Sequence, residues 1–522
     1  MTRPPNILLV TSDQHHHSCL GAVNPRIKTP ALDRLAGEGT RFDRAYTPNP
    51  VCTPARASII TGLYPSVHGA WTIGVKLPED VPTVGAALSR GGYATGLIGK
   101  AHFQPTRSAP ALGSESIETA AVMRDLDFWR SFKGPWYGFD HVEITRNHAD
   151  EAHVGGHYAL WLEEQGFTTW RDHFRPFPPH PDAPPAAGRH GAWDLPERFH
   201  YSTWTAERSM DFVARCHAAG RPFFLWASFH DPHPPYLVPE PWASMYRPED
   251  MEPGQLTPGE HRRNPPHFGL TQQERPDFSP WHESGWANHG FRSHRHTRES
   301  LQRDMAVYYG MTSFMDQQIG RIVTQLDALG LAEDTLVVFT TDHGHFLGQH
   351  GLIAKGAFHY EDLIRVPFLV RWPGRVPAGR VCRELQSTVD LAPTFLAAAG
   401  LPVPGLMQGY DQTPVWCAGA APEPASPRAQ GAHVGPRDHV VVENRHQPTA
   451  VHLRTYVDAR YKLTVYRNGA TGELFDLERD PGEARNLWDA PEARSLKADL
   501  LLKALQYEIQ REPTRMPRVS GA

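Results

Sequence analysis

Several short, uninterrupted apolar runs constrain the fold of this chain more than any other feature. They occupy residues 6–11, 222–228 and 335–340, and each is about the length of one strand. A strand without polar alternation is typical of a sheet that is covered on both faces, as parallel sheets are. Helical patterns at residues 29–39 and 83–91 lie between such runs. The sequence therefore predicts an α/β fold with a mostly parallel sheet between helices.

Polar residues follow directly after the predicted strands, including a strand at residues 94–98. Because the carboxyl ends of parallel strands share one edge of a sheet, where ligands bind, we expect these side chains to converge. The residues at these positions are Asp13, Gln14, Lys100, His102, His230, Asp342 and His343.

Four of these residues form a candidate metal site. Asp13, Gln14, Asp342 and His343 offer carboxylate, amide and imidazole ligands, a set that suits one hard or borderline divalent ion. Taken singly, either aspartate would be a cap or turn residue, so the prediction depends on the set. It leaves calcium and manganese open, and the imidazole slightly favours manganese.

A second candidate centre is the run Cys52-Thr53-Pro54-Ala55-Arg56. Proline is tolerated in a first helical turn, residues 55–61 favour a helix, and Gly62 predicts its end. Cys52 would then lie at a helix N-terminus, where free N–H groups suit an anion. Arg56, one turn on, adds a planar fork of donors that fits tetrahedral oxyanions.

The Cys-x-Pro-x-Arg run resembles the signature of the sulfatases, a branch of the alkaline phosphatase superfamily. The resemblance extends through residues 29–35, 39–42, 45–47 and 61–65. It implies an alkaline-phosphatase-like fold, with a large mixed sheet and a smaller C-terminal α+β subdomain. It also implies that a formylglycine-generating enzyme oxidises Cys52 to formylglycine (3-oxoalanine). One hydroxyl of the hydrated aldehyde would attack the sulfur of a sulfate ester.

The resemblance also implies roles for further residues. Lys100, in Gly99-Lys100-Ala101-His102, and Lys355 would hold the sulfate group. His230 would protonate the leaving oxygen. His102 would take the proton from the second hydroxyl, so that sulfate is released, although the two histidines could exchange roles. The metal ion would orient and acidify the nucleophilic hydroxyl.

Two ligand positions depart from the commonest family pattern, which has Asp at position 14 and Asn at position 343. Gln14 and His343 are more similar to phosphonate monoester hydrolases and choline sulfatases. A phosphonate monoester or phosphodiester hydrolase is therefore the alternative to a hydrolase of small-molecule or saccharide sulfate esters, and residues 245–251 also support it. Lys100 and His102 follow the sulfatase pattern instead. A non-catalytic binding protein would require the loss of a central residue, and none is missing.

The pattern also predicts how the chain is divided. Residues 1–430 would form the catalytic domain, and residues 431–522, with strands near 456–466 and 473–477, a C-terminal subdomain. Stretches rich in Pro, His and Trp near 104–200 and 240–299 are interpreted as insertions that cap the site or mediate assembly, including a possible homo-oligomer. A core helix is predicted at 303–329 and a linker at 418–437.

Composition excludes several partners. A net charge of −5 gives no basic footprint for nucleic acid or an anionic membrane, and no apolar stretch approaches the roughly 20 residues of a membrane span. The five scattered cysteines favour neither disulfides nor a zinc site, which indicates a reducing cytoplasm. With 30 histidines in the chain, the cluster at 15–17 and the nearby His345 and His350 are interpreted as chance rather than a second metal site. Cys19 is interpreted as structural.

Overall fold

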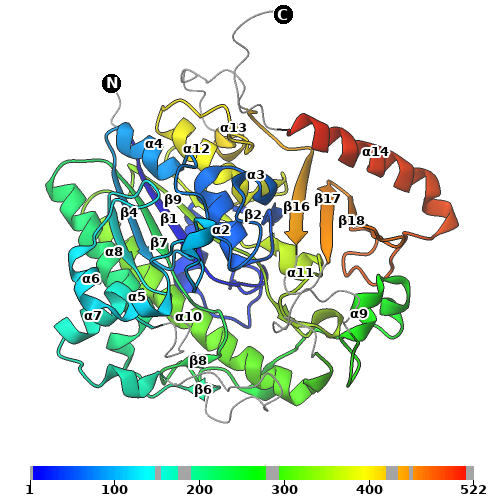
Figure 1. The fold of residues 1–522 in the computed structure, drawn as a ribbon, viewed down its shortest axis with the longest axis horizontal. Coiled ribbons are helices and arrows are strands. Elements are labelled where there is room, and N and C mark those ends of the chain that lie inside the picture. The colour runs from blue at the N-terminus through cyan, green and yellow to red at the C-terminus, as the bar shows by residue number, and fades with distance from the viewer. Residues whose placement is uncertain are drawn as a thin grey trace, which may run out of the picture.

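The computed structural model describes residues 4–146, 154–174, 190–277, 293–418, 433–445 and 451–512. A large central sheet lies between two layers of helices, and a smaller sheet near the C-terminus stands beside it (Figure 1). The strands of the central sheet, in spatial order, are β14 (Arg380–Cys382), β2 (Thr40–Phe42), β13 (Leu369–Arg371), β9 (Thr335–Thr341), β1 (Asn6–Ser12), β7 (Phe223–Ser228), β4 (Ala94–Gly99) and β5 (His141–Ile144).

The five strands from β9 to β5 are mutually parallel, which confirms the predicted mostly parallel sheet. Strand β13 runs antiparallel to β9 and β2, so the sheet is mixed at its other end. The central strand β1 is hydrogen-bonded along both edges, to β7 and β9. Every residue of β1 is buried, as its unbroken apolar run predicts.

Alternate residues of β1 pack against the two helical layers. Ile7 and Leu9 join a core with α2 (Cys52–Thr61), α4 (Val84–Arg90) and α12 (Leu391–Ala398). On the opposite face, Leu8 and Val10 join a core with α1 (Pro30–Glu38), α8 (Tyr201–Ala218) and α10 (Arg298–Ala328). Because successive side chains of a strand point to opposite faces of the sheet, β1 contributes residues to both cores. The predicted helix at 303–329 corresponds to α10.

The stretch near 104–200 differs from the predicted insertion because part of it builds the central sheet. Strand β5 pairs with β4, from Gly96 with His141 to Gly99 with Ile144. Other parts of the stretch, including Tyr158 and Trp193, form an aromatic cluster with Trp204 of α8. The four-residue length of β5 and the polar Glu143 within it explain why no strand was predicted there.

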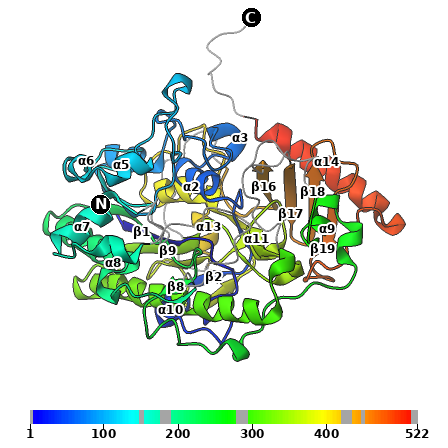
Figure 2. The ribbon, with the colours of Figure 1, turned by 60° about the horizontal axis from the view of Figure 1, so that its bottom comes forward.

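The C-terminal sheet is a four-stranded antiparallel meander, and helix α14 (Arg494–Gln510) packs on it (Figure 2). Both views place this sheet and the helices near 104–200 on opposite sides of the central sheet. The boundary predicted at 430/431 lies outside the described residues, so that division stays a prediction. The strands are β16 (His439–Arg445), β17 (His452–Asp458), β18 (Tyr461–Tyr466) and β19 (Glu473–Asp476).

Short elements complete the described part of the chain, in which no helix has the length and apolarity to cross a membrane. The short helices are α3 (Pro65–His68), α5 (Ala120–Arg124), α6 (Leu126–Ser131), α7 (Gly156–Glu164), α9 (Pro266–Leu270), α11 (Glu361–Ile364) and α13 (Thr413–Trp416). The small sheets pair β3 (Ala45–Tyr46) with β12 (Arg365–Val366) and β15 (Gln386–Ser387), β10 (Phe346–Leu347) with β11 (Ile353–Ala354), and β6 (Gly191–Ala192) with β8 (Leu237–Val238).

Gly99 ends β4 in a conformation that only glycine adopts readily. Its φ is +109°, and a Cβ atom there would lie 1.9 Å from the carbonyl oxygen of Ser228 on β7. Since both atoms belong to the backbone of paired strands, neither can move aside cheaply. Gly99 therefore lets the chain turn towards Lys100 while β4 and β7 remain paired.

We expect Gly99→Ala to lower the free energy of unfolding by about 2 to 4 kcal/mol, because it adds backbone strain and a steric clash. Gly37→Ala is the matched control, since Gly37 is exposed in helix α1 and a Cβ there meets no atom within 4 Å. The control should match or slightly exceed the wild-type stability. Denaturant midpoints of the three proteins check this, and an unchanged midpoint for Gly99→Ala would contradict it.

Candidate active site

Three of the predicted strand-end residues and Cys52 meet at one buried point. One ligand atom from each of Asp13, Cys52, Asp342 and His343 lies within 4.8 Å of the others, and all four side chains are buried. Asp13 follows β1, Asp342 and His343 follow β9, and Cys52 begins α2. The sheet edge and the helix N-terminus therefore meet as the sequence predicts.

The sulfur of Cys52 stands at the junction of this cluster. Lys355 Nζ lies 3.0 Å from the sulfur, His343 Nε2 lies 3.3 Å away and Asp13 Oδ1 3.7 Å away. Helix α2 ends at Gly62, which has a left-handed φ of 65° and whose N–H donates to the carbonyl of Ser58. The predicted helix and its stop are confirmed. The N-terminus of α2 and the ammonium group of Lys355 therefore both lie at Cys52.

Arg56 connects three strand ends without any exposure to solvent. Its Nε donates to Asp342 Oδ2 at 2.9 Å, and its Nη1 donates to Ser228 Oγ at 2.8 Å and to the carbonyl of Lys100 at 3.0 Å. Burying a guanidinium costs free energy unless its charge is paired, and the Asp342 carboxylate pairs the charge here. Arg56 therefore fixes the position of Asp342 relative to β4 and β7.

The two carboxylates of the cluster have different surroundings. Burial and the neighbouring charge of Asp342 raise the pKa of Asp13 to about 7, although Lys100, which contacts its carboxylate directly, opposes this. Burial acts in the same direction on Asp342, but His343, Arg56 and Lys100 outweigh it and hold the pKa of Asp342 well below its usual value. Two buried carboxylates this close repel each other, and a cation between them would relieve the repulsion.

The donor atoms of the predicted ligands fit a divalent ion. Gln14 Nε2 is hydrogen-bonded to His345 Nδ1 at 2.7 Å, whereas Gln14 Oε1 is buried and has no hydrogen-bond partner among the described residues. His343 Nδ1 donates to the carbonyl of Gly344 at 2.9 Å, which leaves the lone pair on Nε2, the atom that faces Cys52. The site therefore offers carboxylate, amide and imidazole ligand atoms to one ion.

The two predicted catalytic histidines lie beside the end of β5. His230 Nε2 donates to the carbonyl of Thr145 at 3.1 Å, and Arg146 Nη2 lies 3.2 Å from His102 Nε2. Glu118 Oε1 accepts the backbone N–H of His102 at 2.9 Å. Prediction from sequence missed Arg146 because it lies in the stretch that was interpreted as an insertion. Its position becomes evident only when the short strand β5 is paired with β4.

The histidine cluster at 15–17 has structural partners. The backbone N–H of Ser18 donates to His16 Nδ1 at 3.1 Å, and His16 Nε2 lies 2.9 Å from Asp362 Oδ1 and 3.3 Å from Gln349 Nε2. Both ring nitrogens of His16 are therefore already in contact with protein groups. Although His16, His17 and Asp362 lie close together, this hydrogen-bond pattern does not favour an ion among them. Tyr236 and Gln14 bind the two ring nitrogens of His345.

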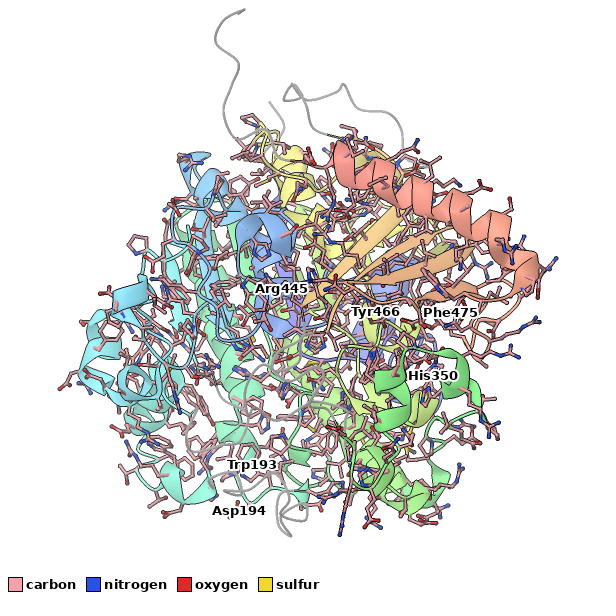
Figure 3. The ribbon with its side chains drawn as sticks, turned by 45° about the vertical axis from the view of Figure 1, so that its right-hand side comes forward. Trp193, Asp194, His350, Arg445, Tyr466 and Phe475 are labelled. Carbon is pink, nitrogen blue, oxygen red and sulfur yellow. The ribbon has the colours of Figure 1, made fainter. Side chains whose placement is uncertain are left out.

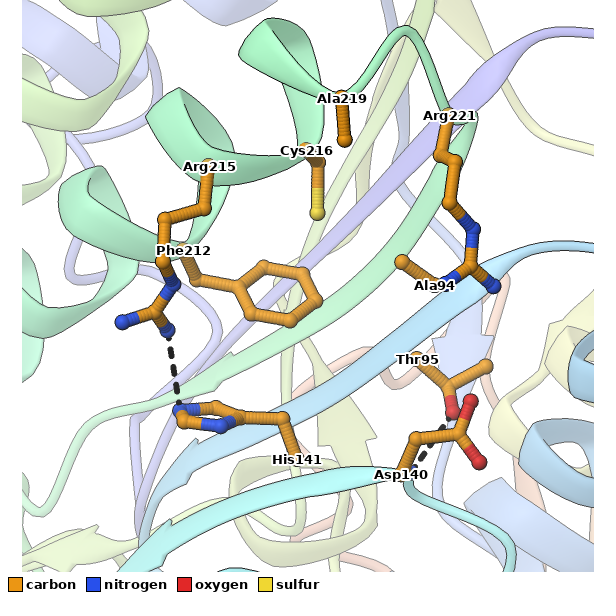
Figure 4. Close-up of a pocket in the computed structure, with 9 residues that line it drawn as sticks. All are labelled: Ala94, Thr95, Asp140, His141, Phe212, Arg215, Cys216, Ala219 and Arg221. Atoms are coloured by element: carbon orange, nitrogen blue, oxygen red, sulfur yellow. Dashed lines mark hydrogen bonds between the residues drawn. The ribbon is translucent and has the colours of Figure 1, made fainter.

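A surface pocket at the beginning of β4 lies away from this site (Figure 4). Ala94 and Thr95 line it, whereas the candidate residues follow the opposite end of β4. Its polar groups already have partners: Arg215 Nη2 lies 3.2 Å from His141 Nε2, and the Asp140 N–H donates to Thr95 Oγ1 at 2.9 Å. None of the predicted site residues lines this pocket.

Comparison with known proteins agrees with the motif and the fold. A model of the sulfatase family matches residues 5–401, which is well over half of the chain. The chain belongs to the sulfatase family. A second model, for the C-terminal part of N-sulphoglucosamine sulphohydrolase, matches residues 348–510. These matches confirm the family that the run from Cys52 to Arg56 predicts.

The relatives of this sulfatase include both predicted classes. An arylsulfatase from Clostridium perfringens is 28% identical, with 97% of this chain and 94% of that protein covered. PehA from Trinickia caryophylli, described as a multifunctional alkaline phosphatase superfamily protein, is 29% identical over 98% and 96% of the two chains. The structure of a phosphonate monoester hydrolase from Agrobacterium radiobacter superposes with a TM-score of 0.75, at 26% identity and over 97% and 96% of the two chains. The alkaline-phosphatase-like fold is thereby confirmed.

His350 is a second buried charge centre, where this sulfatase joins its C-terminal sheet (Figure 3). Its ring stacks on Tyr360 with the centroids 3.5 Å apart, and its Nδ1 lies 2.8 Å from Glu260 Oε1. Burial alone would lower the pKa of His350, but the carboxylates of Asp362 and Glu260 outweigh it and raise the pKa to about 9. The imidazole is therefore charged in the folded protein at neutral pH.

We expect His350 to stabilise the fold fully below about pH 6.5, its unfolded pKa, and to lose this contribution as pH rises through about 9. His350→Gln should cost up to about 3 kcal/mol at low pH, and the difference from wild type should shrink at high pH. Denaturant titrations across this range check the trend. His217→Gln, at an exposed position of α8, is the control. A deficit that stays constant with pH would contradict the charged state of His350.

Proposed function

We propose that this sulfatase hydrolyses sulfate esters of small molecules or saccharides, with a formylglycine formed from Cys52 and one divalent metal ion. The observation that carries the proposal is the position of the Cys52 sulfur, in contact with Lys355, His343 and Asp13 at the meeting point of β1, β9 and α2. Family membership supports the reaction class.

The residues around Cys52 suit the binding of a sulfate group. Lys355 and Lys100 supply two buried ammonium groups, and Arg56 anchors the carboxylate of Asp342. Fixed cations in a buried site stabilise charge that develops on ester oxygens, because they need no reorganisation during the reaction. Formylglycine, once generated by a maturation enzyme, would supply the nucleophilic hydroxyl.

We propose that Asp13, Gln14, Asp342 and His343 hold the metal ion. Three oxygen ligands and one imidazole suit manganese or calcium, and the imidazole favours manganese. A bound divalent ion would acidify and orient a hydroxyl group. We also propose a cytoplasmic location, which is supported by four buried cysteines that are free thiols, Cys19, Cys52, Cys216 and Cys382. Homo-oligomer formation stays a prediction.

Removal of the metal should abolish activity, and Asp13→Ala should lose the ion, because it deletes a carboxylate from the ligand set. Metal content per folded molecule, measured by mass spectrometry after dialysis, checks this. Asp316→Ala is the control, since Asp316 is also a buried aspartate but caps helix α1 by accepting the N–H groups of Ala31 and Leu32. If the Asp13 variant keeps stoichiometric metal, Asp13 is not a ligand.

The alternative function is hydrolysis of phosphonate monoesters or phosphodiesters at the same site. Gln14 and His343 favour it, and so does the structural similarity to a phosphonate monoester hydrolase.

A parallel assay of an aryl sulfate, an aryl phosphonate and an aryl phosphodiester on metal-replete protein decides between these functions. We expect the sulfate ester to react with the highest kcat/KM, and its rate to scale with the fraction of Cys52 converted to formylglycine, measured by peptide mass spectrometry. Cys52→Ala is the inactive control. A higher kcat/KM for either phosphorus ester would replace the proposed function by the alternative. Full specific activity with unmodified Cys52 would reject the formylglycine mechanism.

A further inference from the structure

Two consecutive residues at the end of β5 contact both candidate catalytic histidines. The carbonyl of Thr145 accepts a hydrogen bond from His230 Nε2, and the guanidinium of Arg146 donates to His102 Nε2. A carbonyl only accepts, so His230 Nε2 must carry a proton. A guanidinium only donates, so His102 Nε2 must be unprotonated. The end of β5 therefore sets opposite tautomers in the two rings.

These contacts are held by further hydrogen bonds. The N–H of Thr145 donates to the carbonyl of Gly99 at 3.2 Å, which continues the pairing of β5 with β4. Arg146 Nη1 donates to the carbonyl of Gln104 at 3.1 Å, and the Gln104 N–H donates to Glu118 at 2.7 Å. Both terminal nitrogens of the Arg146 guanidinium therefore have hydrogen-bond partners, which fix the position of the side chain.

We infer that Arg146 is a positioning residue that holds His102 as a neutral imidazole with its proton on Nδ1. The inference rests on the proposed function. His102 Nδ1 is buried and has no hydrogen-bond partner among the described residues. It is a donor suited to an anionic oxygen of a bound ester. Since Arg146 occupies the lone pair of Nε2, His102 has no nitrogen that can accept a proton.

The charges around His102 keep its ring neutral. Burial lowers the pKa of His102 well below its usual value, and the positive charges of Arg146, Lys100, Arg56 and Lys355 act in the same direction. The only carboxylate that the described hydrogen bonds place at His102 is that of Glu118, and it accepts the backbone N–H rather than a ring proton. A neutral imidazole can stabilise developing negative charge as a hydrogen-bond donor.

His230 has the complementary tautomer. With its proton on Nε2 and donated to Thr145, the lone pair lies on Nδ1. Burial lowers the pKa of His230 well below its usual value, so the ring is neutral before a substrate reacts. His230 therefore takes the base role that the family resemblance gives to His102. In that step a hydroxyl O–H bond breaks, its electron pair stays on oxygen, and the proton forms an N–H bond at Nδ1.

The tautomers can be read directly from the protein with unmodified Cys52, without any activity. In long-range ¹H–¹⁵N spectra of ¹⁵N-histidine-labelled protein, His102 should show a protonated-type Nδ1 and an unprotonated-type Nε2, and His230 the reverse. His102→Gln and His230→Gln assign the two sets of signals by their disappearance. A protonated-type Nε2 in His102 would overturn the inference.

Substitution of Arg146 tests its part in this arrangement. Arg146→Met should release His102 into a mixture of tautomers and raise the pH at which its ring signals titrate, because a donor and a cation are lost. Arg208→Met is the control, since Arg208 of α8 is an arginine that also binds β5, through Glu143 at 2.7 Å. The control should leave the His102 signals unchanged. Unchanged His102 signals in Arg146→Met, or equal changes in both variants, would reject the positioning role.

Kinetics of the enzyme that carries formylglycine at position 52 distinguish a hydrogen-bond donor from a base at positions 102 and 230. If His102 donates a hydrogen bond, His102→Gln should retain at least about tenfold more activity than His102→Ala, because an amide N–H can donate in its place. At position 230, glutamine and alanine should be equally poor, with losses on the order of 10² to 10⁴ in kcat/KM, since neither accepts a proton. Equal losses for both variants at position 102 would overturn the donor role. Because the spectra need no turnover, failure of the tautomer assignment is distinguishable from failure of the proposed function.

Discussion

The buried contact between Asp342 and Arg56 is the interaction on which the rest of the site depends. Both side chains are fully buried, and their 2.9 Å pairing lies between β9 and α2. An unpaired charge at this depth would cost several kcal/mol, so neither residue could be retained without the other. Because Arg56 also binds the ends of β4 and β7, this single pair aligns four elements around Cys52.

The parallel sheet explains why so few residues are needed to build the site. Strands β9, β1, β7, β4 and β5 end at the same edge, and each delivers one or two polar residues there. The apolar side chains of these strands pack into the two cores, so the strand ends cannot shift independently of one another. Rigid strands thus place their polar ends more accurately than loops of similar sequence would.

The strand-end residues could be predicted from the sequence because they follow long apolar runs, which are the clearest signal of buried strands. Asp13 and Asp342 are of this kind. Arg146 could not be found in the same way, because β5 is only four residues long and its polar Glu143 interrupts the apolar pattern. Its partner β4 supplies the hydrogen bonds that make it a strand. That contribution comes from tertiary pairing and leaves no trace in the local sequence.

Charge alone does not separate a sulfate ester from a phosphonate monoester at this site. A sulfate monoester and a phosphonate monoester each carry one negative charge, so Lys100 and Lys355 would attract both. The difference is that sulfate presents three non-bridging oxygens, whereas a phosphonate replaces one of them by a carbon substituent. The side chains that contact the Cys52 sulfur in the described part of the chain are Lys355, His343 and Asp13, all polar. A phosphonate bound with its carbon substituent among them would leave buried polar groups without partners, so the direction in which that substituent points decides whether the site can discriminate between the two esters.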